Sequence, residues 1–395
     1  MTASSVKILV VGLRGMPHVQ GGIETHAAEL YPRLASLGAD VTVLGRNRFR
    51  PAGVGSCWRG VRLKWLWAPK RRGFEAAIHT ILGVLYAGIR RPDVLHIHAV
   101  GPSITAPLAR LLGLRVVMTH HGQDYLREKW GRSERTVIRW GERFAVRFCN
   151  EIIAISSHLR TLLHSQYGRE AVWIPNGVGA RKERAGRDLL QRYRLTAQKY
   201  VIQVARLVPE KRQLDLISAF RALQLPGWKL VLVGSSQSEE PYAGEVLRAA
   251  AHDEAIVCTG ALGAAETHEL LADAGVFVLP SSHEGLPIAL LEALSYGIPS
   301  LASDIPGNRE LVLQDDSYFP VGDIAALAAR LQTLATSARA RLAAIRCYPE
   351  ICARFDWDQI ALATLAVMHK ASGLPSSRKR SHGSAVTPVK TAAQE

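Results

Sequence analysis

The chain has 395 residues, of which 48% are hydrophobic and 21% charged, so it is long enough for two domains that each bury a core. Its five cysteines are widely spaced and form no Cys-x-x-Cys pair, which argues against a zinc ribbon, a thioredoxin-like site or a secreted disulfide scaffold and favours a reducing cytoplasm. The net charge of +15 belongs to residues 1–200, where 32 Lys and Arg accompany 13 Asp and Glu, whereas residues 201–395 carry 17 and 21.

The first half alternates short β-branched runs with longer amphipathic stretches, the pattern of a parallel sheet covered by helices. The apolar run 8–11 is too short for a signal peptide and is expected to be a strand, and the longest run, 76–89, is too short to span a bilayer. A helix is predicted over 24–37, because Gly38 follows its last apolar position. The predicted strands are 7–12, 41–44, 94–98, 115–119, 151–155 and 171–174.

The second half repeats this alternation after a charged, glycine-containing stretch, which we interpret as the domain boundary. The predicted strands are 200–204, 229–233, 256–259, 276–279 and 300–302, and the predicted helices are 212–223, 242–251, 264–272, 288–296 and 324–346. We therefore expect one α/β domain over 1–178, a linker over 179–198, a second α/β domain over 199–355, a last helix over 356–372 and a disordered tail over 373–395.

Two such sheets place a ligand cleft at the carboxyl ends of their strands, and the first candidate motif lies there. Gly21 and Gly22 precede a helix start, where backbone N–H groups and the helix dipole can meet an anion. A flexible loop would explain these glycines equally well. The G-x-G-x-x-G fingerprint of dinucleotide binding is absent, which argues against a dehydrogenase.

Two further candidate motifs also follow predicted strands. His120 and His121 stand beside Gly122, and one of the two rings must face the cleft, because neighbouring side chains on a strand point to opposite faces. The pattern leaves open which one does. Arg206 and Lys211 follow the first strand of the second domain, where their charges suit a diphosphate, although surface Arg and Lys residues are common.

The strongest motif combines Glu284 and Glu292, eight residues apart, with a helix that begins near Pro287. The N–H groups of residues 285–288 form a second anion site there. The two acids can accept hydrogen bonds from hydroxyls on the two sides of a bound phosphate. A sugar nucleotide carries that arrangement of sugar hydroxyls, diphosphate and ribose hydroxyls.

Taken in chain order, Gly21-Gly22-Ile23-Glu24, His121-Gly122, Arg206 with Lys211, and Glu284-x7-Glu292 resemble the retaining glycosyltransferases of family 4. The resemblance covers about residues 7–371, and residues 119–131 are similar to a bacterial rhamnosyl- or mannosyltransferase-like branch. It implies the α/β GT-B fold, in which two doubly wound Rossmann-like domains face each other across a cleft and a C-terminal helix crosses back to the N-terminal domain. It also implies transfer of a hexose from a nucleotide-diphosphate sugar to a saccharide acceptor. Because the basic residues of the first half suit docking on a membrane, we expect this acceptor to be lipid-linked, as in exopolysaccharide, capsule or O-antigen biosynthesis.

The same resemblance assigns roles to individual residues. Arg206 and Lys211 would hold the diphosphate, Glu284 the sugar hydroxyls and Glu292 the ribose. The implied donor site also includes Gly21, Gly22, Gly285, Leu286 and Pro287, and the implied catalytic set is His121, Glu284, Arg206 and Lys211. The acceptor side is assigned to His120, His121 and Asp124. One departure is Arg212, which stands where the family usually has glycine.

No facing carboxylate pair of the glycosidase kind is identifiable, so the resemblance implies retention by front-face substitution, with the leaving diphosphate accepting the acceptor's proton. We expect no metal ion and no other cofactor. A nucleotide-sugar epimerase or hydrolase of the same fold is the alternative function, and a phosphorylase would need a lysine-bound pyridoxal phosphate. A nucleic-acid binder would explain the charge but not the two acids, so no nucleic-acid partner is expected.

Basic residues at helical spacing make up much of the excess charge of the first half. They are Arg132, Arg135, Arg139, Arg143 and Arg147, interleaved with aromatic residues, and Lys70, Arg71 and Arg72 form a second cluster beside the aromatic run 64–67. Such a surface suits docking on an anionic membrane, and the ordinary alternative is a solvated face with the aromatic rings turned into the core. We therefore expect a cytoplasmic protein associated peripherally with the inner face of the membrane.

Overall fold

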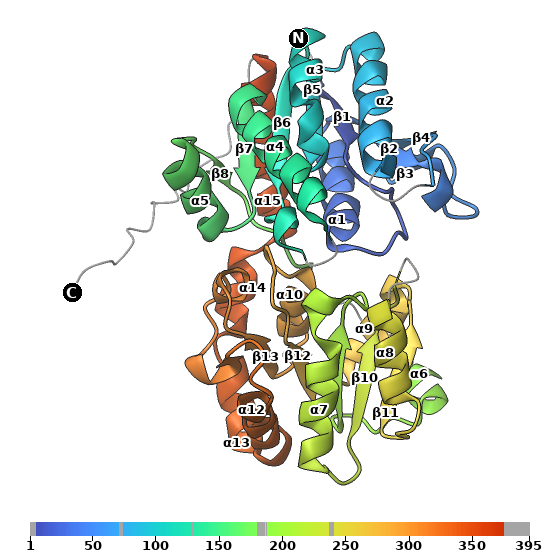
Figure 1. The fold of residues 1–395 in the computed structure, drawn as a ribbon, viewed down its shortest axis with the longest axis vertical. Coiled ribbons are helices and arrows are strands. Elements are labelled where there is room, and N and C mark those ends of the chain that lie inside the picture. Colours follow the sequence, from blue (N-terminus) through green and yellow to red (C-terminus); the bar gives the residue numbers. More distant parts are fainter. Residues whose placement is uncertain are drawn as a thin grey trace, which may run out of the picture.

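The computed structural model describes residues 5–70, 74–127, 130–179, 186, 188–236 and 241–374. They form two α/β lobes stacked along the long axis of the molecule, each built on one sheet (Figure 1). The carboxyl ends of the strands of both sheets point toward the junction of the lobes. The predicted fold class, two facing doubly wound domains, is confirmed.

The N-terminal sheet has eight strands, and all neighbouring pairs are parallel except β3 with β4. Their order is β3 (Cys57–Trp58), β4 (Val61–Leu66), β2 (Asp40–Arg46), β1 (Lys7–Val11), β5 (Val94–His98), β6 (Val116–His120), β7 (Glu151–Ala154) and β8 (Val172–Trp173). All six predicted strands are present. β4 was not predicted as a strand: it buries Val61 and Leu63 and exposes Arg62 and Lys64, so its outward face resembles a basic surface cluster.

Helices cover both faces of this sheet. Helix α1 (Gly22–Ser36) and the last helix, α15 (Trp357–Ser372), share one hydrophobic core with one face of the strands. Helices α2 (Phe74–Arg90), α3 (Ala106–Leu111) and α4 (Arg132–Phe148) pack on the other face, and α5 (Ser157–Tyr167) follows β7. The helix predicted over 24–37 is thus α1, shifted by one to two residues.

The C-terminal sheet is entirely parallel. Its order is β11 (Ile256–Gly260), β10 (Lys229–Val233), β9 (Tyr200–Val204), β12 (Val276–Leu279), β13 (Ser300–Ser303) and β14 (Tyr318–Phe319). The helices of this lobe are α6 (Asp188–Arg192), α7 (Gln213–Leu223), α8 (Pro241–Ala250), α9 (Ala264–Ala272), α10 (Ile288–Ser295), α11 (Pro306–Arg309), α12 (Ile324–Thr336), α13 (Ala338–Ile345) and α14 (Tyr348–Arg354).

The larger departures from the prediction concern one helix and the linker. The single helix predicted over 324–346 is divided, because Ser337 is extended and its hydroxyl accepts a hydrogen bond from the backbone N–H of Ala340 (3.1 Å), which starts α13. The predicted linker 179–198 is too long. Helix α6 already belongs to the C-terminal lobe, where the N–H of Leu189 donates to the Glu269 carboxylate (2.6 Å).

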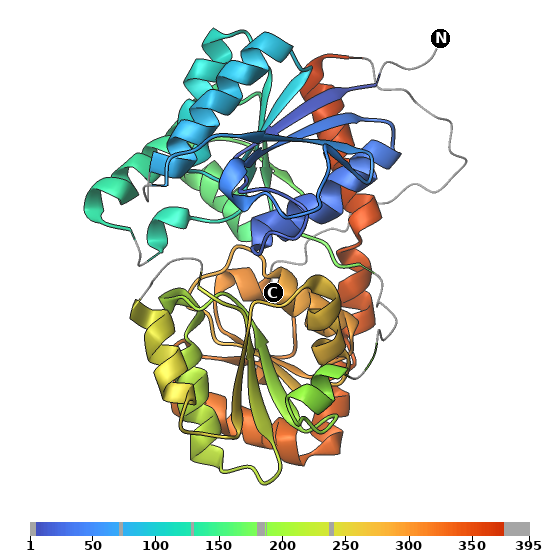
Figure 2. The same ribbon diagram turned by 90° about the vertical axis from the view of Figure 1, so that its right-hand side faces the viewer.

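The chain crosses between the lobes twice, and the two crossings lie side by side. The N–H of Val178 donates to the carbonyl oxygen of Phe355 (2.7 Å), and Val178 forms a β-bridge with Asp356. The Asp356 carboxylate then caps α15, which runs back along the N-terminal lobe as predicted (Figure 2). Residues 375–395 of the predicted tail lie outside the described residues.

A candidate active site between the lobes

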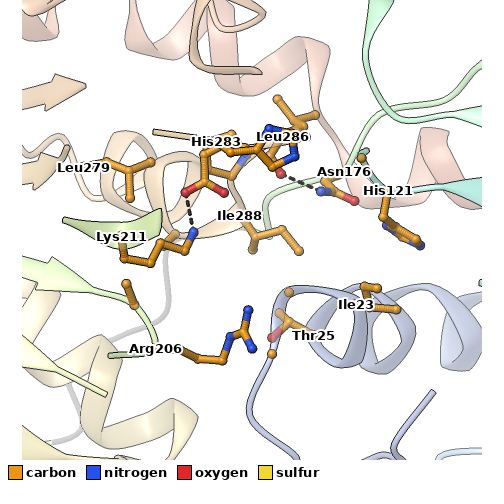
Figure 3. Close-up of a pocket in the computed structure, with 18 of the residues that line it drawn as sticks. Ile23, Thr25, His121, Asn176, Arg206, Lys211, Leu279, His283, Leu286 and Ile288 are labelled. Atoms are coloured by element: carbon orange, nitrogen blue, oxygen red, sulfur yellow. Dashed lines mark hydrogen bonds and ion pairs between the residues drawn. The ribbon is translucent and has the colours of Figure 1, made fainter. Parts of the chain in front are cut away.

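A cavity of 240 Å³ lies between the lobes and is lined by both of them (Figure 3). The N-terminal lobe contributes the start of α1 and the turn after β6, and the C-terminal lobe contributes the β9–α7 loop and the segment that leads into α10. Most residues singled out from the sequence line it: Gly21, Gly22, His121, Arg206, Lys211, Glu284, Gly285, Leu286, Pro287 and Glu292. The structure thus brings the predicted donor-binding residues together, and their individual roles stay predictions.

Lys211 and Glu284 form an ion pair across the cavity wall, with side chains 17% and 11% exposed. Burial opposes ionisation of the Glu284 carboxyl, but the Lys211 ammonium group outweighs it and lowers the pKa of Glu284 below its usual value. The two loops are tied by a hydrogen bond from the N–H of Ser282 to the carbonyl oxygen of Glu210 (2.9 Å). A fixed cation and a fixed anion therefore stand side by side in the cavity.

Arginines concentrate positive charge at the centre of the cleft. Burial and the guanidinium groups of Arg127 and Arg14 together lower the pKa of Arg206. Arg127 comes from the opposite lobe and lines the same cavity. Like charges that approach in a half-buried space favour a bound anion, and guanidinium groups fit phosphate oxygens.

Two helices point their N-termini at the cavity. Gly21 precedes α1 with φ 149°, a backbone conformation that residues with a Cβ atom rarely adopt. The side chains of Arg14 and Glu24, which form an ion pair (2.8 Å), pack closely against it. Helix α10 begins at Ile288 directly after Pro287. The first N–H groups of both helices have no acceptor within their own helix ladder and add partial positive charge to that of the arginines.

The two adjacent histidines have different surroundings, and only one of them lines the cavity. His121 is half-buried and lines the cavity. His120, which was also assigned to the acceptor side, does not line the cavity. Its ring is 1% exposed, its Nδ1 accepts from the N–H of Gly122 (3.2 Å), and its Nε2 donates to Glu142 of α4 (2.8 Å). His120 therefore anchors the turn that presents His121.

The place of Asp124 on the acceptor side stays a prediction. Asp124 is absent from the cavity lining, and its carboxylate pairs with Arg127 (2.8 Å), so it holds a cavity residue in place. Sequence reasoning missed Arg127 itself, and it missed Asn176. The amide of Asn176 donates to the carbonyl oxygen of Leu286 across the cleft (2.7 Å) and accepts from His26 (2.9 Å).

The lobes touch directly beside the cavity. A Cβ atom built on Gly285 would overlap the carbonyl oxygen of His121, so only glycine permits this approach of the two chains. The cavity volume of 240 Å³ is also below the range of about 300–1,000 Å³ typical of ligand sites. The structure therefore corresponds to closed lobes.

One cluster of histidines could be considered for a metal. Among the described residues, ring nitrogens of His26, His98 and His121 lie within 4.8 Å of one another. The pKa of His26 is lowered to about 4 by burial, so its imidazole is neutral. A hydrogen bond between His98 Nδ1 and His121 Nε2 (2.8 Å) already occupies one nitrogen of each of these rings.

The predicted basic helix is α4, whose outer face carries the arginine stripe. Arg132, Arg139, Arg143 and Arg147 are exposed, and Arg135 is half-buried. Of the interleaved aromatic residues Trp140 is exposed (47%), whereas Trp130, Phe144 and Phe148 are half-buried. Lys70 is exposed, and Arg71 and Arg72 lie outside the described residues.

Apolar side chains accompany this basic face on the neighbouring helices. Large exposed ones are Phe74 (64%), Ile81 (40%), Leu85 (43%) and Ile89 (81%) on α2, Leu111 (86%) on α3 and Val137 (51%) on α4. Within the part of the chain that the structure describes, no helix combines the length and apolar character needed to cross a membrane.

The sequence of this chain is similar to those of characterised enzymes. The GDP-mannose-dependent alpha-(1-6)-phosphatidylinositol monomannoside mannosyltransferase of Mycobacterium tuberculosis is 33% identical over 232 residues, which is 53% of this chain and 57% of that protein. The chain thus matches little more than half the length of this relative.

Solved structures share the two-lobed architecture. Sucrose-phosphate synthase from Thermosynechococcus elongatus superposes with a TM-score of 0.78 at 20% identity, covering 92% of this chain and 98% of that one. Anabaena HepE, solved in complex with UDP-glucose, superposes with a TM-score of 0.76 at 19% identity, covering 92% and 99%. At these identities the likeness concerns the fold.

Two family models match consecutive parts of the chain. Glycosyltransferase Family 4 matches residues 20–181, and Glycosyl transferases group 1 matches residues 190–346. The first covers most of the N-terminal lobe and the second most of the C-terminal lobe, with only residues 182–189 between them. The chain therefore belongs to the glycosyltransferases of the GT-B fold, with a family 4 domain followed by a group 1 domain.

Proposed function

We propose that the protein is a retaining glycosyltransferase that moves a hexose from a nucleotide-diphosphate sugar to a lipid-linked saccharide acceptor in exopolysaccharide, capsule or O-antigen biosynthesis. The observation that carries the proposal is the convergence of Arg206, Lys211 and Glu284 with the start of α1 around one cavity. The relatives support the substrate classes, since one is named for a GDP-mannose donor and a phosphatidylinositol-based acceptor and another was solved with UDP-glucose.

Electrostatic stabilisation of the leaving group is the main contribution that these residues can make. As the bond to the sugar breaks, negative charge develops on the diphosphate, and Arg206 and Lys211 face that charge together with the two helix N-termini. These groups are held in place before the reaction, so little reorganisation accompanies it. The departing diphosphate oxygen takes the proton of the acceptor hydroxyl, so no protein base is needed. No metal ion is expected, because Arg206, Lys211 and the helix N-termini face the charge that a metal would otherwise neutralise.

The two acids would orient the donor from both ends. Glu284 is ionised beside Lys211 and can accept hydrogen bonds from sugar hydroxyls. Glu292, on α10, lines the same cavity and can accept from the ribose. Because Gly285 contacts the turn of His121, the lobes must separate for the donor to enter, and their closure then excludes water.

A screen of nucleotide sugars tests this function. UDP-, GDP- and dTDP-sugars are added to the purified protein, and its melting temperature is measured for the wild type and for Arg206→Gln. We expect one nucleotide class to raise the melting temperature of the wild type and to have less effect on the variant. No stabilisation by any of them would contradict the proposal.

A time course with the donor alone separates the alternatives. Proton NMR of the bound class of sugar nucleotide is followed without an acceptor. A transferase leaves the donor largely intact until an acceptor is added. Steady isomerisation or hydrolysis instead would identify the epimerase or hydrolase alternative.

We also propose that the outer face of α2, α3 and α4 docks on an anionic membrane at the cytoplasmic side. The support is the combination of exposed arginines on α4 with exposed apolar side chains on all three helices. Each cationic residue near such a surface contributes about 1 kcal/mol, and the apolar side chains add burial in the headgroup region. This surface would bring the cleft to a lipid-linked acceptor.

Vesicle flotation tests the docking. Phosphatidylcholine vesicles with and without phosphatidylglycerol are compared at two salt concentrations. We expect binding only with phosphatidylglycerol, weaker at high salt, and reduced in Arg139→Glu/Arg143→Glu. The matched control is Arg248→Glu/Arg339→Glu, which reverses two exposed arginines of the other lobe. Equal binding of both double variants, or none by the wild type, would contradict docking.

A further inference from the structure

A chain of hydrogen bonds runs from the cavity into the interior of the N-terminal lobe. His121 Nε2 is bonded to His98 Nδ1 (2.8 Å), and His98 Nε2 is bonded to the hydroxyl of Tyr31. The same hydroxyl is bonded to His96 Nδ1 (2.8 Å), and His96 Nε2 is bonded to the hydroxyl of Thr119 (2.7 Å). Helix α1, strand β5 and strand β6 each contribute to this chain.

Burial makes the chain a set of neutral groups. Tyr31, His96 and His98 have no exposed surface, and Thr119 is 1% exposed. Burial lowers the pKa of His96 to about 3 and the pKa of His98 and His121 well below the usual histidine value. A neutral imidazole carries one N–H group and one lone pair, so each ring can donate on one side only and must accept on the other.

Only two proton arrangements make every bond of this chain and also give the buried Tyr31 hydrogen an acceptor. If both histidines donated to the Tyr31 oxygen, its own hydrogen would be left without a partner in the chain. In one arrangement, all bonds donate toward the cavity, and the Nδ1 atom of His121 carries a hydrogen. In the other, every group donates its hydrogen in the direction of Thr119, and His121 Nδ1 carries a lone pair and no hydrogen. Because the chain ends at the buried Thr119, it offers no path for protons to solvent. Its effect is to couple the tautomer of His121 to the positions of all its other protons, so that this tautomer cannot change on its own.

The geometry argues against a metal at the same histidines. The ring centroids of His98 and His121 are 5.1 Å apart with planes inclined by 24°, and the bonded nitrogens are 2.8 Å apart. That centroid separation matches two ring radii plus the bond, so the nitrogens point straight at each other along the line of the rings. Zinc would instead need both lone pairs to converge at about 2.0–2.1 Å from one point.

We propose that Tyr31, His96 and His98 are positioning residues that hold His121 in one tautomer and one orientation toward the donor sugar. This rests on the proposed function of the cavity that His121 lines. The free nitrogen of His121 then presents either a fixed donor or a fixed acceptor to a sugar hydroxyl. A histidine left free to change tautomer would offer the correct group only part of the time.

Removing one hydroxyl from the chain tests the proposal. Tyr31→Phe leaves the ring in place, and we expect kcat/KM to fall about tenfold, the factor that corresponds to one hydrogen bond of ordinary strength. The matched control is Tyr348→Phe. It removes a similarly buried hydroxyl, which accepts from the N–H of Ser300 (3.0 Å) at the amino end of β13, the end of the strand remote from the cleft. We expect the control to keep full activity.

Two substitutions of His98 probe the same link. In His98→Asn the amide stands near the former Nδ1 and can still bond to His121. In His98→Gln it stands near the former Nε2 and bonds to Tyr31 instead. We expect the asparagine variant to keep several-fold more activity than the glutamine variant. Equal activity of the two would contradict the proposal.

A double-mutant cycle separates positioning from general destabilisation. In a His121→Ala background the chain has nothing left to position, so Tyr31→Phe is expected to have no further effect on kcat/KM. A full tenfold loss in that background would refute the proposal.

NMR of the histidine rings supplies a readout that does not depend on activity. With ¹⁵N-labelled histidine, we expect one tautomer for His121 in the wild type and a mixture in Tyr31→Phe. An unchanged single tautomer in the variant would overturn the proposal. Failure of the wild type to bind any nucleotide sugar would instead refute the proposed function and leave this NMR result standing.

Discussion

Replacing Lys211 by methionine removes the ammonium group beside Glu284 and keeps most of the aliphatic side chain. Two effects are expected from the structure. The first is on catalysis, because a preorganised cation at a developing charge is worth about 10²–10³ in rate. We therefore expect kcat/KM of Lys211→Met to fall by about that factor while the protein remains folded.

The second effect is on stability, and its sign depends on pH. In the wild type the pKa of Glu284 is lowered, so the pair stabilises the fold above the unfolded pKa of about 4.3, and this contribution is lost as the pH falls through the lower folded pKa. In Lys211→Met, burial becomes the dominant influence and raises the pKa of Glu284. The folded state then binds a proton more tightly than the unfolded state, so its stability falls as the pH rises.

Leaving a buried group unpaired costs about 1–3 kcal/mol, which lowers the melting temperature by several degrees. The assay is urea unfolding of both proteins from pH 4 to pH 7, with Lys211→Met/Glu284→Gln as the control. The control has no ionisable group at either position. The difference in free energy of unfolding between the control and the wild type should therefore vary less with pH than the difference between Lys211→Met and the wild type. If the free energy of unfolding depended on pH in the same way for the wild type and Lys211→Met, the electrostatic account of this pair would be refuted.

Three further predictions concern the cleft. In Gly285→Ala the new Cβ overlaps the carbonyl oxygen of His121, so we expect impaired closure and a fall in kcat of at least tenfold in steady-state kinetics. The control Gly101→Ala, which has open space at its Cβ, should keep the wild-type kcat. Equal kcat values for the two variants would contradict the role of the contact between the lobes. Glu292→Gln should weaken nucleotide binding by about tenfold in calorimetry, since a charge-assisted hydrogen bond becomes a neutral one, and an unchanged affinity would remove Glu292 from the ribose site. EDTA should leave the rate of sugar transfer unchanged. Loss of transfer activity in EDTA would show that a metal is required.

The sequence predicted the parallel sheets well, because buried parallel strands are continuous β-branched runs. It failed at β4, where Trp65 and alternating basic residues belong to a strand at the margin of the sheet. In that segment the exposed basic side chains obscure the alternation of buried and exposed residues that marks a strand. The division between α12 and α13 was missed for a different reason, because a single serine cap decides it.

The candidate site was predicted where motifs follow strand ends, since topology alone brings those ends together. The choice between His120 and His121 could not be made, because it depends on Glu142, a buried acid of α4 that no local pattern connects with the turn. Asn176 was missed for the same reason, because it owes its place to His26 and Leu286, which are distant in the sequence. Arg127 is held by a local ion pair with Asp124, but its approach to Arg206 of the other lobe is not encoded by sequence spacing.

The paired crossings at Val178 and Phe355 restrict how the lobes can move. Two strands of chain that are hydrogen-bonded to each other resist sliding and twisting far more than a single flexible tether would, so the remaining freedom is rotation about an axis close to this bond. Such a rotation widens the gap most at the rim farthest from the crossings. Substrates should therefore enter and nucleotide should leave by that rim, and a disulfide placed there would trap whatever the cleft contains.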